Sequence, residues 1–473
     1  MFHLFIKRIT FLIFWIGLSL FRLSSQEQTT TQGTTGTARM VIAELDRKAE
    51  AMKKSIRKTR SDIHISGTTY YVSAKGNDAN DGLSVKRPLK SLAKVNTLDL
   101  IEGDAVLFRR GDLWRGTLKT KDGVTYSAYG KGAKPTLCGS PCDAAKEGVW
   151  SETETPNVYM YDRELPDDIG TLVFNEGEAC AFKVMRQHDQ TGRTIHIETK
   201  EPFSDYRDLK RDLDFFHDYK VKKRVYLYSS KGNPSKRFES IELLVKTNIV
   251  YARNQVTIDN LCIKYCGAHG IGSGYTKGLT VTNCELGWIG GSIQGDSLYA
   301  RSHPTRYGNA IEVYGGCDSF LVDNCYIYQV YDAGITHQFS KGGNNSIVMK
   351  NVVYSNNLVE DCVYSIEYFL GKADNDAERY MDNVVFSNNL LRRSGYGWGK
   401  QRPDKETPAH IKSWNSQNRA YNFFIKNNVF DRGTRVLLNT EAAEQEWLPV
   451  LQGNTYIQLD NISIETPDCP PSY

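Results

Sequence analysis

The chain has 473 residues, with 59 Lys and Arg against 55 Asp and Glu, for a formal net charge of +4. This length allows one large core or two to three domains. The nearly balanced charge argues against a nucleic-acid-binding protein, which would need a strongly basic domain.

The first 25 residues are typical of a signal peptide or signal anchor. Lys7 and Arg8 form a basic start, and an apolar run follows over residues 9–21. That run is short for a membrane span and suits the apolar core of a signal peptide. Leu23 is not the small residue that a cleavage site near residues 24–26 prefers, so a retained anchor is the alternative. We expect a secreted or cell-surface protein that meets a membrane only through this segment.

Residues 26–67 combine a Thr-rich linker with an amphipathic helix. The stretch 24–37, "SSQEQTTTQGTTGT", has no core-forming residues. After it, Val41, Leu45, Met52 and Ile56 recur near helical spacing among charged residues. We expect a short helix that lies on a surface of the protein.

Three further segments follow. Residues 68–139 begin with a β-branched and aromatic strand that runs into a Gly/Asn/Asp turn cluster, and then give a short helix and another strand. Residues 140–235 are charged and irregular, which indicates an inserted β-rich subdomain. Residues 236–473 carry a repeat and form the main body.

The repeat is an apolar–x–Asn–Asn/Cys–apolar pattern. Its markers are Asn260, Asn283, Asn324, Asn356, Asn388, Asn427 and, weakly, Gly453. Recurrence every ~23 to 41 residues is typical of a solenoid of short strands, in which each turn pairs in parallel with its neighbours. Asn tolerates the left-handed conformation that a tight bend needs. The following residues, Asn357, Asn389 and Asn428, should form an amide ladder up the stack. Cys284 and Cys325 replace the amide in two turns.

Ten cysteines in an exported chain could form a disulfide framework. The repeat positions of Cys284 and Cys325 favour small buried thiols instead. Cys138 and Cys142 in "LCGSPC" are a candidate local bridge. A zinc site would need two pairs of closely spaced ligand residues on loops, and we see none.

The segments "YYVSAKGNDANDGLS", "PLKSLAKV" and "GDAVLFRRGDLWRGTL" resemble the start of many exported β-helix proteins, and "FFHDYKVKKRVYLYSS" resembles an insertion found among them. Over residues 68–460 the chain resembles the right-handed parallel β-helix proteins of the pectate-lyase-like superfamily. This resemblance implies an all-β fold: a right-handed parallel β-helix solenoid with an inserted β-rich subdomain and a short N-terminal helix. Because that superfamily includes lyases, hydrolases, epimerases and adhesins, the chemistry must be argued from the residues.

One strand of each turn can be aligned by an inward aliphatic residue: Ile271, Ile311, Ile335, Ile366, Ile411 and Val436. Since strand side chains alternate, the flanking positions point outward. This alignment places one set of polar and aromatic residues on a single outer face: Glu312, Glu367, Lys412, His410, Tyr314, Gln338 and Trp414. Long loops at 291–309 and 399–409 flank the face and carry Arg306 and Arg402. Such loops would wall a groove, while His337 should point inward.

Glu312 and Glu367 would lie two turns apart, about 9–10 Å between backbones. Inverting glycosidases hold their two carboxyl groups about 6.5–9.5 Å apart. We therefore expect a glycoside hydrolase with Glu312 as general acid and Glu367 or Asp332 as general base. Lys412, one turn from Glu367, should lower the pKa of that carboxyl group.

The remaining groove residues would bind the substrate. His410, Lys412 and Gln338 would position hydroxyl groups, and Trp414 or Tyr314 would stack on a sugar ring. Arg306 and Arg402 are further candidates. The partner would be a carbohydrate polymer or oligosaccharide bound by a monomer, with no nucleic acid and no cofactor.

Two alternatives remain. In a polysaccharide lyase, Lys412 or Arg402 would abstract a proton beside a uronate carboxylate, and a Ca²⁺ ion held by Glu312 and Glu367 would neutralise that carboxylate. In a non-catalytic surface glycan-binding or adhesin solenoid, the same charges would be exposed ion pairs of little energetic value.

Overall fold

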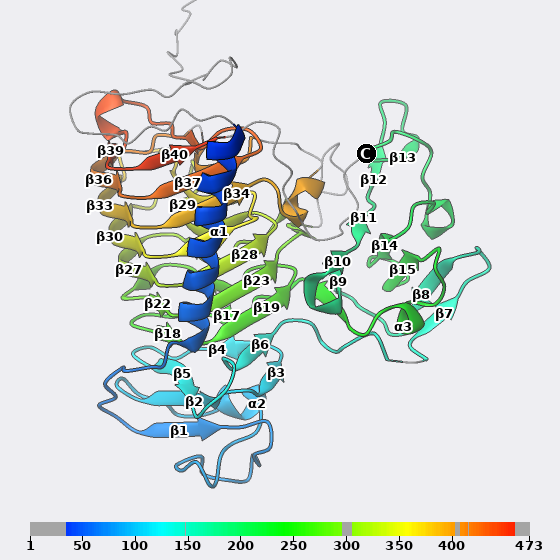
Figure 1. Cartoon of the computed structure of the whole chain (residues 1–473), viewed down its shortest axis with the longest axis horizontal. Helices are drawn as coiled ribbons and strands as arrows, with labels where there is room; N and C mark the ends of the chain where they lie inside the picture. The colour runs from blue at the N-terminus through cyan, green and yellow to red at the C-terminus, as the bar shows by residue number, and fades with distance from the viewer. Residues whose placement is uncertain (1–34, 147, 296–304, 403–406, 415, 459–473) are drawn as a thin grey trace, which may run out of the picture.

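The computed structural model describes residues 35–146, 148–295, 305–402, 407–414 and 416–458. The expected export signal at residues 1–25 lies outside this range. Three long sheets wind around one interior as a parallel β-helix, with a subdomain attached at one side (Figure 1). The strand pairing confirms the β-helix that the repeat and the resemblance predicted.

Sheet A joins strands from both ends of the chain, in the order β1 (Thr69–Val72), β2 (Ala105–Arg109), β5 (Thr125–Tyr129), β18 (Thr257–Asp259), β22 (Thr280–Thr282), β27 (Cys317–Asp323), β30 (Ile347–Ser355), β33 (Arg379–Ser387), β36 (Ala420–Lys426) and β39 (Val450–Gln452), with β21 (Thr276–Lys277) also on β27. Sheet B follows the order β3 (Leu113–Arg115), β6 (Thr136–Cys138), β19 (Cys262–Cys266), β23 (Glu285–Ile289), β28 (Tyr326–Val330), β31 (Leu358–Glu360), β34 (Leu390–Ser394), β37 (Val429–Gly433) and β40 (Thr455–Ile457).

Sheet C carries the candidate site. Its order is β4 (Leu118–Lys119), β17 (Val250–Tyr251), β20 (Ile271–Ser273), β26 (Ile311–Tyr314), β29 (Ala333–Phe339), β32 (Tyr364–Leu370), β35 (Ala409–Ser413) and β38 (Leu438–Asn439). Aliphatic and aromatic side chains from all three sheets fill the interior from Val72 to Phe430. Each turn alone has no core, so stacking is what removes this apolar surface from water.

The repeat asparagines take the roles that the sequence predicted. All six marker asparagines have positive φ, between 51° and 58°, as does Gly453 at 61°. The next residues form the ladder: the side-chain Nδ2 of Asn357 donates to Oδ1 of Asn389 at 3.0 Å, and Nδ2 of Asn389 donates to Oδ1 of Asn428 at 2.9 Å. The backbone N–H of Cys325 donates to Oδ1 of Asn357 at 2.9 Å, so Cys325 occupies the next position of the ladder with a thiol in place of the amide. Asn454, which the sequence reading missed, continues it beyond Asn428.

Helix α1 (Thr35–Lys58) lies along the outside of sheet B, roughly parallel to the stack (Figure 1). Leu45, Ala49 and Ile56 pack against tyrosine and leucine side chains of β28, β31 and β34. Lys53 pairs with Glu360 at 2.6 Å, and Arg57 pairs with another sheet B carboxylate at 3.0 Å. The predicted apolar face is therefore the docking face. In the described part of the chain, no helix is both long and apolar enough to cross a membrane.

The inserted strands form sheets of their own. They are β7 (Trp150–Glu152), β8 (Val158–Tyr161), β9 (Ile169–Phe174), β10 (Ala179–Cys180), β11 (Phe182–Lys183), β12 (Arg186–His188), β13 (Thr194–His196), β14 (Asp214–Asp218), β15 (Arg224–Tyr228) and β16 (Ile241–Val245). The main insert sheet has the order β11-β14-β15-β8-β7, while β10-β9-β16 and β12-β13 form two smaller ones.

Short helices and one small hairpin complete the described part of the chain. They are α2 (Leu92–Val95), η1 (Asn175–Gly177), η2 (Tyr206–Asp208), α3 (Pro234–Arg237), η4 (Trp398–Gln401) and η5 (Gln445–Trp447), with the antiparallel pair β24 (Ser292–Ile293) and β25 (Arg306–Tyr307).

A buried ion pair within the insert lies where the insert contacts the β24–β25 hairpin. Lys183 Nζ donates to both carboxylate oxygens of Asp168, at 2.7 and 2.5 Å, and both side chains are buried. The backbone N–H of Ile293 in β24 donates to Asp168 Oδ2 at 2.7 Å. One insert carboxylate is thus tied to a strand outside the insert.

Cysteine pairing differs from one prediction. Cys138 and Cys142 are free thiols, so the proposed local bridge is wrong. The guanidinium of Arg115 lies 3.2 Å from the sulfur of Cys138, and the sulfur of Cys142 lies 3.1 Å from the Tyr161 hydroxyl. Cys284 and Cys325 are buried free thiols as expected, and Cys180 is disulfide-bonded.

Candidate active site

The predicted alignment of sheet C is confirmed over five strands. The paired positions run Ile271↔Ile311↔Ile335↔Ile366↔Ile411. The last position is a correction, because Leu438 rather than Val436 pairs with Ile411. The loop before β38 is longer than the sequence pattern suggested, so counting from Val436 slipped the register by two residues.

The outward neighbours of these aliphatic residues therefore form one row across the stack. The pairs are Glu312↔Thr336, Thr336↔Glu367 and Glu367↔Lys412. The two glutamates lie on the second-neighbour strands β26 and β32. Both carboxylic side chains are nearly covered, with Glu312 8% and Glu367 4% exposed.

Glu367 lies at the centre of the row and is held on both oxygens. The indole Nε1 of Trp414 donates to Oε1 at 2.5 Å, and the Thr336 hydroxyl donates to Oε2 at 3.3 Å. Trp414 is fixed in turn by an edge contact with Tyr364, with 5.9 Å between ring centroids. Thr336 is a site residue that the sequence reading placed outward without giving it a role.

The pKa of Glu367 is raised to about 8, first by burial and then by the nearby charge of Asp332. The hydrogen bond from Trp414 and the charge of Arg402 oppose this rise without overcoming it. The expected lowering by Lys412 is wrong. The Lys412 ammonium lies 4.3 Å from the ring centre of Trp414 and donates to Asn439 Oδ1 at 3.1 Å. Burial of the Glu367 carboxyl group, which the sequence did not show, decides the direction in which its pKa shifts.

Asp332 forms an ion pair with Arg402, whose Nη1 lies 2.8 Å from Oδ1. Arg402 follows η4 and is itself 7% exposed, with its guanidinium 5.6 Å from the ring centres of both Tyr331 and Tyr364. The structure thus brings these two predicted residues together beside Glu367. An ion pair with a guanidinium favours the carboxylate form of Asp332.

Glu312 is surrounded by donors on one oxygen. The Nε2 of Gln338 donates to Oε2 at 3.0 Å, and the Nδ2 of Asn309 donates to the same atom. The ring Nδ1 of His269 accepts the backbone N–H of Asn309 at 3.1 Å and lies 3.3 Å from the same Glu312 oxygen. Asn309 and His269 were not among the predicted site residues. His269 stands in the short "AHG" stretch that precedes Ile271, and that position was the available signal.

Two predicted groove residues point elsewhere. His410 is fully buried: its Nδ1 lies 3.0 Å from the Ser365 hydroxyl and its Nε2 lies 3.1 Å from the backbone carbonyl oxygen of Arg432. Burial lowers its pKa to about 4, which leaves the ring neutral. The expectation that it faces the groove is therefore wrong. The rule that strand side chains alternate between inside and outside failed here. The His410 ring packs against β37 instead, at the corner between sheets C and B.

Arg306 is also buried, at 2% exposure. Its guanidinium donates to the carbonyl oxygens of Gly291 at 2.6 Å and Gly170 at 2.9 Å. The side chain thus joins the β24–β25 hairpin to the insert instead of facing open solvent. By contrast, Tyr314 is 42% exposed, with its hydroxyl 2.8 Å from Ser340 Oγ. His337 lies in the interior, as predicted, with Nδ1 2.8 Å from the Tyr354 hydroxyl.

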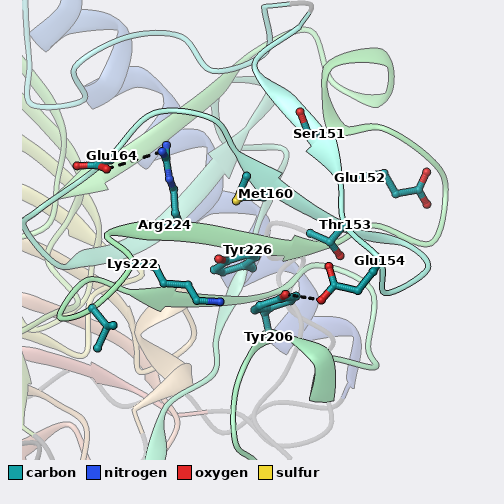
Figure 2. A pocket seen from close by; sticks show the side chains of 11 residues that line it. Ser151, Glu152, Thr153, Glu154, Met160, Glu164, Tyr206, Lys222, Arg224 and Tyr226 are labelled. Carbon is teal, nitrogen blue, oxygen red and sulfur yellow. Dashed lines mark hydrogen bonds and ion pairs between the residues drawn. The ribbon is translucent and has the colours of Figure 1, made fainter.

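One hollow of the described surface lies on the insert, away from the glutamates. It measures about 710 Å³ and is bounded by β7, β8, β15 and η2 (Figure 2). Its groups satisfy one another: Tyr206 and Tyr226 stack at 4.0 Å, the Tyr206 hydroxyl donates to Glu154 at 2.7 Å, and Arg224 faces Glu164 at 3.8 Å. We therefore place the chemistry on sheet C. Among the described residues, no group of three or more His, Cys, Asp or Glu side chains is arranged to hold a metal ion.

Known proteins resemble this chain in part. No family model matches it. Over 106 residues it is 41% identical to a lacto-N-biosidase of Bifidobacterium longum subsp. longum, a match that covers 20% of this chain and 6% of that protein. The chain thus spans only a small part of this relative's length.

Several solved structures have a similar course of the chain. A complex of XylC with xylose is 12% identical, with 82% of this chain and 68% of that chain covered and a TM-score of 0.45. The GH136 lacto-N-biosidase from Eubacterium ramulus is 14% identical, with 90% and 72% covered and a TM-score of 0.32. Pectate lyase Pel9A is 10% identical, with 86% and 80% covered and a TM-score of 0.29. The assignment of this chain to the parallel β-helix proteins follows from its own strand pairing.

Proposed function

We propose that the protein is an exported glycoside hydrolase in which Glu367 is the general acid and Glu312 the general base. The observation that carries this proposal is the state of Glu367: a buried carboxyl group on an outer sheet face, with its pKa raised to about 8. A glycosidase needs one carboxylic acid that stays protonated near neutral pH and a second that is ionised. These roles reverse those expected from the sequence.

The proton on Glu367 would move to the oxygen that joins two sugars as the bond from that oxygen to the anomeric carbon breaks. Trp414 and Thr336 fix the carboxyl group, so the proton is presented in one direction. Protonation of the leaving oxygen by a positioned acid is worth roughly 10²- to 10⁴-fold in rate. The Asp332–Arg402 pair acts through Glu367, because the Asp332 charge raises the pKa of that acid.

Glu312 has one oxygen occupied and one free for water. The amides of Asn309 and Gln338 both donate to Oε2, so this oxygen is occupied by two hydrogen bonds. Within the described residues, Oε1 of Glu312 has no hydrogen-bond partner. The strands of the two glutamates are two spacings apart, about 9.6 Å. At this spacing a water would lie between the carboxyl groups, and its oxygen would bond to the anomeric carbon from the face opposite the leaving oxygen as Glu312 takes its proton. We therefore expect inversion of the anomeric configuration.

One observation supports hydrolysis over a lyase, and a second supports a carbohydrate substrate in general. The cations that a lyase would use as bases, Lys412 and Arg402, are engaged with Asn439 and Asp332. The partial similarity to a lacto-N-biosidase supports a carbohydrate substrate. A Ca²⁺-dependent lyase and a binding-only solenoid remain predictions, and chelator treatment with ultraviolet detection of unsaturated uronates separates the first from hydrolysis.

The test is release of reducing ends from a panel of plant, host and microbial glycans, with and without chelator. We expect the parent to cleave at least one glycan, and Glu367→Gln to lose roughly 10²- to 10⁴-fold in kcat. Glu378→Gln, an exposed glutamate before β33, is the matched control and should keep full activity. Equal rates for parent and Glu367→Gln would refute the assignment.

A further inference from the structure

The row of sheet C that carries the glutamates continues beyond Glu312 toward the N-terminal end of the stack. The paired positions are Glu312↔Gly272, Gly272↔Tyr251 and Tyr251↔Lys119. Lys119 on β4 is thus five strand spacings from Glu367, about 24 Å. We call this outer surface, from Lys119 through Tyr251 and Gly272 to Gly274, the distal face.

The floor of the distal face is open at Gly274, where an added Cβ would meet no atom within 4 Å. At Gly272 the side chain of Asn248 covers the sheet, with its Nδ2 2.5 Å from where a Cβ would stand. The other described glycines with such open space all have positive φ, which explains them, whereas Gly274 does not. Gly274 follows β20 and has no positive φ, so this position does not require the backbone freedom that glycine provides. Open space above the sheet is what this residue preserves.

Exposed aromatic rings border the floor. Tyr251 is 46%, Tyr275 64% and Tyr314 42% exposed, and they come from three successive turns. Large exposed rings gathered on one face are typical of a binding surface. Tyrosine offers an apolar ring for the C–H face of a sugar and a hydroxyl for hydrogen bonding.

The far end of the distal face is cationic. A hollow of about 550 Å³ is lined by Lys119, Lys121 and Arg253, with Asp122 and Leu100 also on its wall. Arg253 pairs with Asp122 at 3.0 Å. Among the described residues, neither the Lys119 nor the Lys121 ammonium group has a hydrogen-bond or ion-pair partner. The hollow therefore has two cations that no protein anion neutralises.

We propose that the distal face binds a glycan chain extending from the cleavage point, and that the hollow of Lys119 and Lys121 holds an anionic group on a distal sugar. The proposal rests on the proposed function for the position of the cleavage point. A carboxylate and a sulfate ester offer the same charge and acceptors to two ammonium groups, so either chemistry fits. The substrate is then an acidic oligosaccharide or polysaccharide that spans several strands.

The experiment measures binding and cleavage separately. Glu367→Gln protein is applied to an array on which each glycan backbone is present in graded lengths and in neutral, uronate-bearing and sulfated forms. We expect long acidic chains to bind tightest, with affinity falling as salt rises. Adding Lys119→Ser with Lys121→Ser should weaken that binding at least about fivefold, while neutral chains change little. Lys131→Ser with Lys231→Ser removes the same charge elsewhere and should change nothing.

Gly274→Leu tests the floor. Its backbone conformation and open space accept a side chain, so folding should be unaffected, which an unchanged melting temperature checks. We expect it to weaken binding of long chains at least about fivefold and leave the shortest bound glycans unchanged. Comparing binding to the uronate-bearing and the sulfated glycans on the array shows which anion is preferred.

The outcomes separate the two proposals. Binding that ignores length, charge and these substitutions, or no binding on any arm, overturns the distal face even if the parent cleaves glycans. Loss of acidic-chain binding in these variants supports the distal face even if no glycan is cleaved, in which case only the hydrolase assignment fails.

Discussion

Glu367 shows how the position of one side chain in the fold sets its chemistry. The residue follows an inward isoleucine on β32, so it faces outward, yet the Trp414 ring and its neighbours cover it. Removing water disfavours the charged form, and the Asp332 carboxylate adds to the effect. The result is a carboxyl group suited to donate a proton near neutral pH.

This pKa has a consequence for stability. The folded pKa of Glu367, about 8, lies above its ordinary value of 4.5. Its contribution to folding is therefore fully present below about pH 4.5 and is lost as pH rises toward 8. Glutamine mimics the protonated form at every pH. We expect the melting temperature of Glu367→Gln to exceed that of the parent by a margin that grows from pH 4.5 to 8 and then levels off.

Glu378→Gln is the control for that series and should follow the parent at every pH. A margin for Glu367→Gln that stays constant across the range, or that shrinks as pH rises, would show that the carboxyl group is ionised in the folded protein at neutral pH.

At the scale of elements, the asparagine ladder fixes one bend of each turn. Asn389 is 1% exposed; it donates to the carbonyl oxygen of Tyr354 and to Asn428 Oδ1, both at 2.9 Å, and accepts from Asn357. Each partner is buried, so losing this amide leaves several polar groups unsatisfied. A buried group without a partner costs about 1–3 kcal/mol.

We expect Asn389→Ala to lower the free energy of unfolding by about 2–3 kcal/mol, measured by denaturant titration. Asn344→Ala changes an exposed asparagine on the loop before β30 and should fall within about 0.5 kcal/mol of the parent. If both variants lose the same small amount, the ladder contributes little and the apolar interior alone holds the turns together.

The repeat made the elements predictable, and its limits explain the errors. Inward aliphatic residues and left-handed asparagines recur in each turn, so the register from Ile271 to Ile411 could be read from the sequence. The pattern of inward aliphatic residues fails at Val436, because the repeat does not encode the length of the loop before β38 and Leu438 takes the paired position. His410 was misplaced because alternation does not describe the corner between two sheets. The direction of the Glu367 pKa depends on burial by Trp414, a contact between turns that spacing does not reveal.

At the scale of the whole molecule, the insert meets the β24–β25 hairpin at Asp168, which is paired with Lys183 inside the insert. Burial lowers the pKa of Lys183 to about 8, although the Asp168 charge opposes this. Asp168 also accepts from the backbone of β24, the hairpin held by Arg306. The position of the insert beside the stack therefore depends on charges that water does not reach.

Lys183→Met should destabilise the protein by about 3–5 kcal/mol, because it leaves Asp168 buried without a cation. Adding Asp168→Asn removes that unpaired charge, so the double variant should be more stable than Lys183→Met alone. Hydrogen exchange at β9 and β24 is the local readout and should speed up in the single variant. A double variant that is less stable than the single one would contradict this account of the joint.

In the proposed mechanism, a protonated Glu367, whose pKa is raised by the Asp332 charge, supplies the acid for glycoside cleavage. The most direct measurement is the pH dependence of kcat/KM for the parent and for Asp332→Asn on a cleaved glycan. The parent rate should fall as pH rises through about 8, and the Asp332→Asn rate should fall at a lower pH, since a charge that raises the pKa of Glu367 is gone. A parent profile that stays flat through pH 8, or an alkaline limb that moves upward in Asp332→Asn, would contradict the claim.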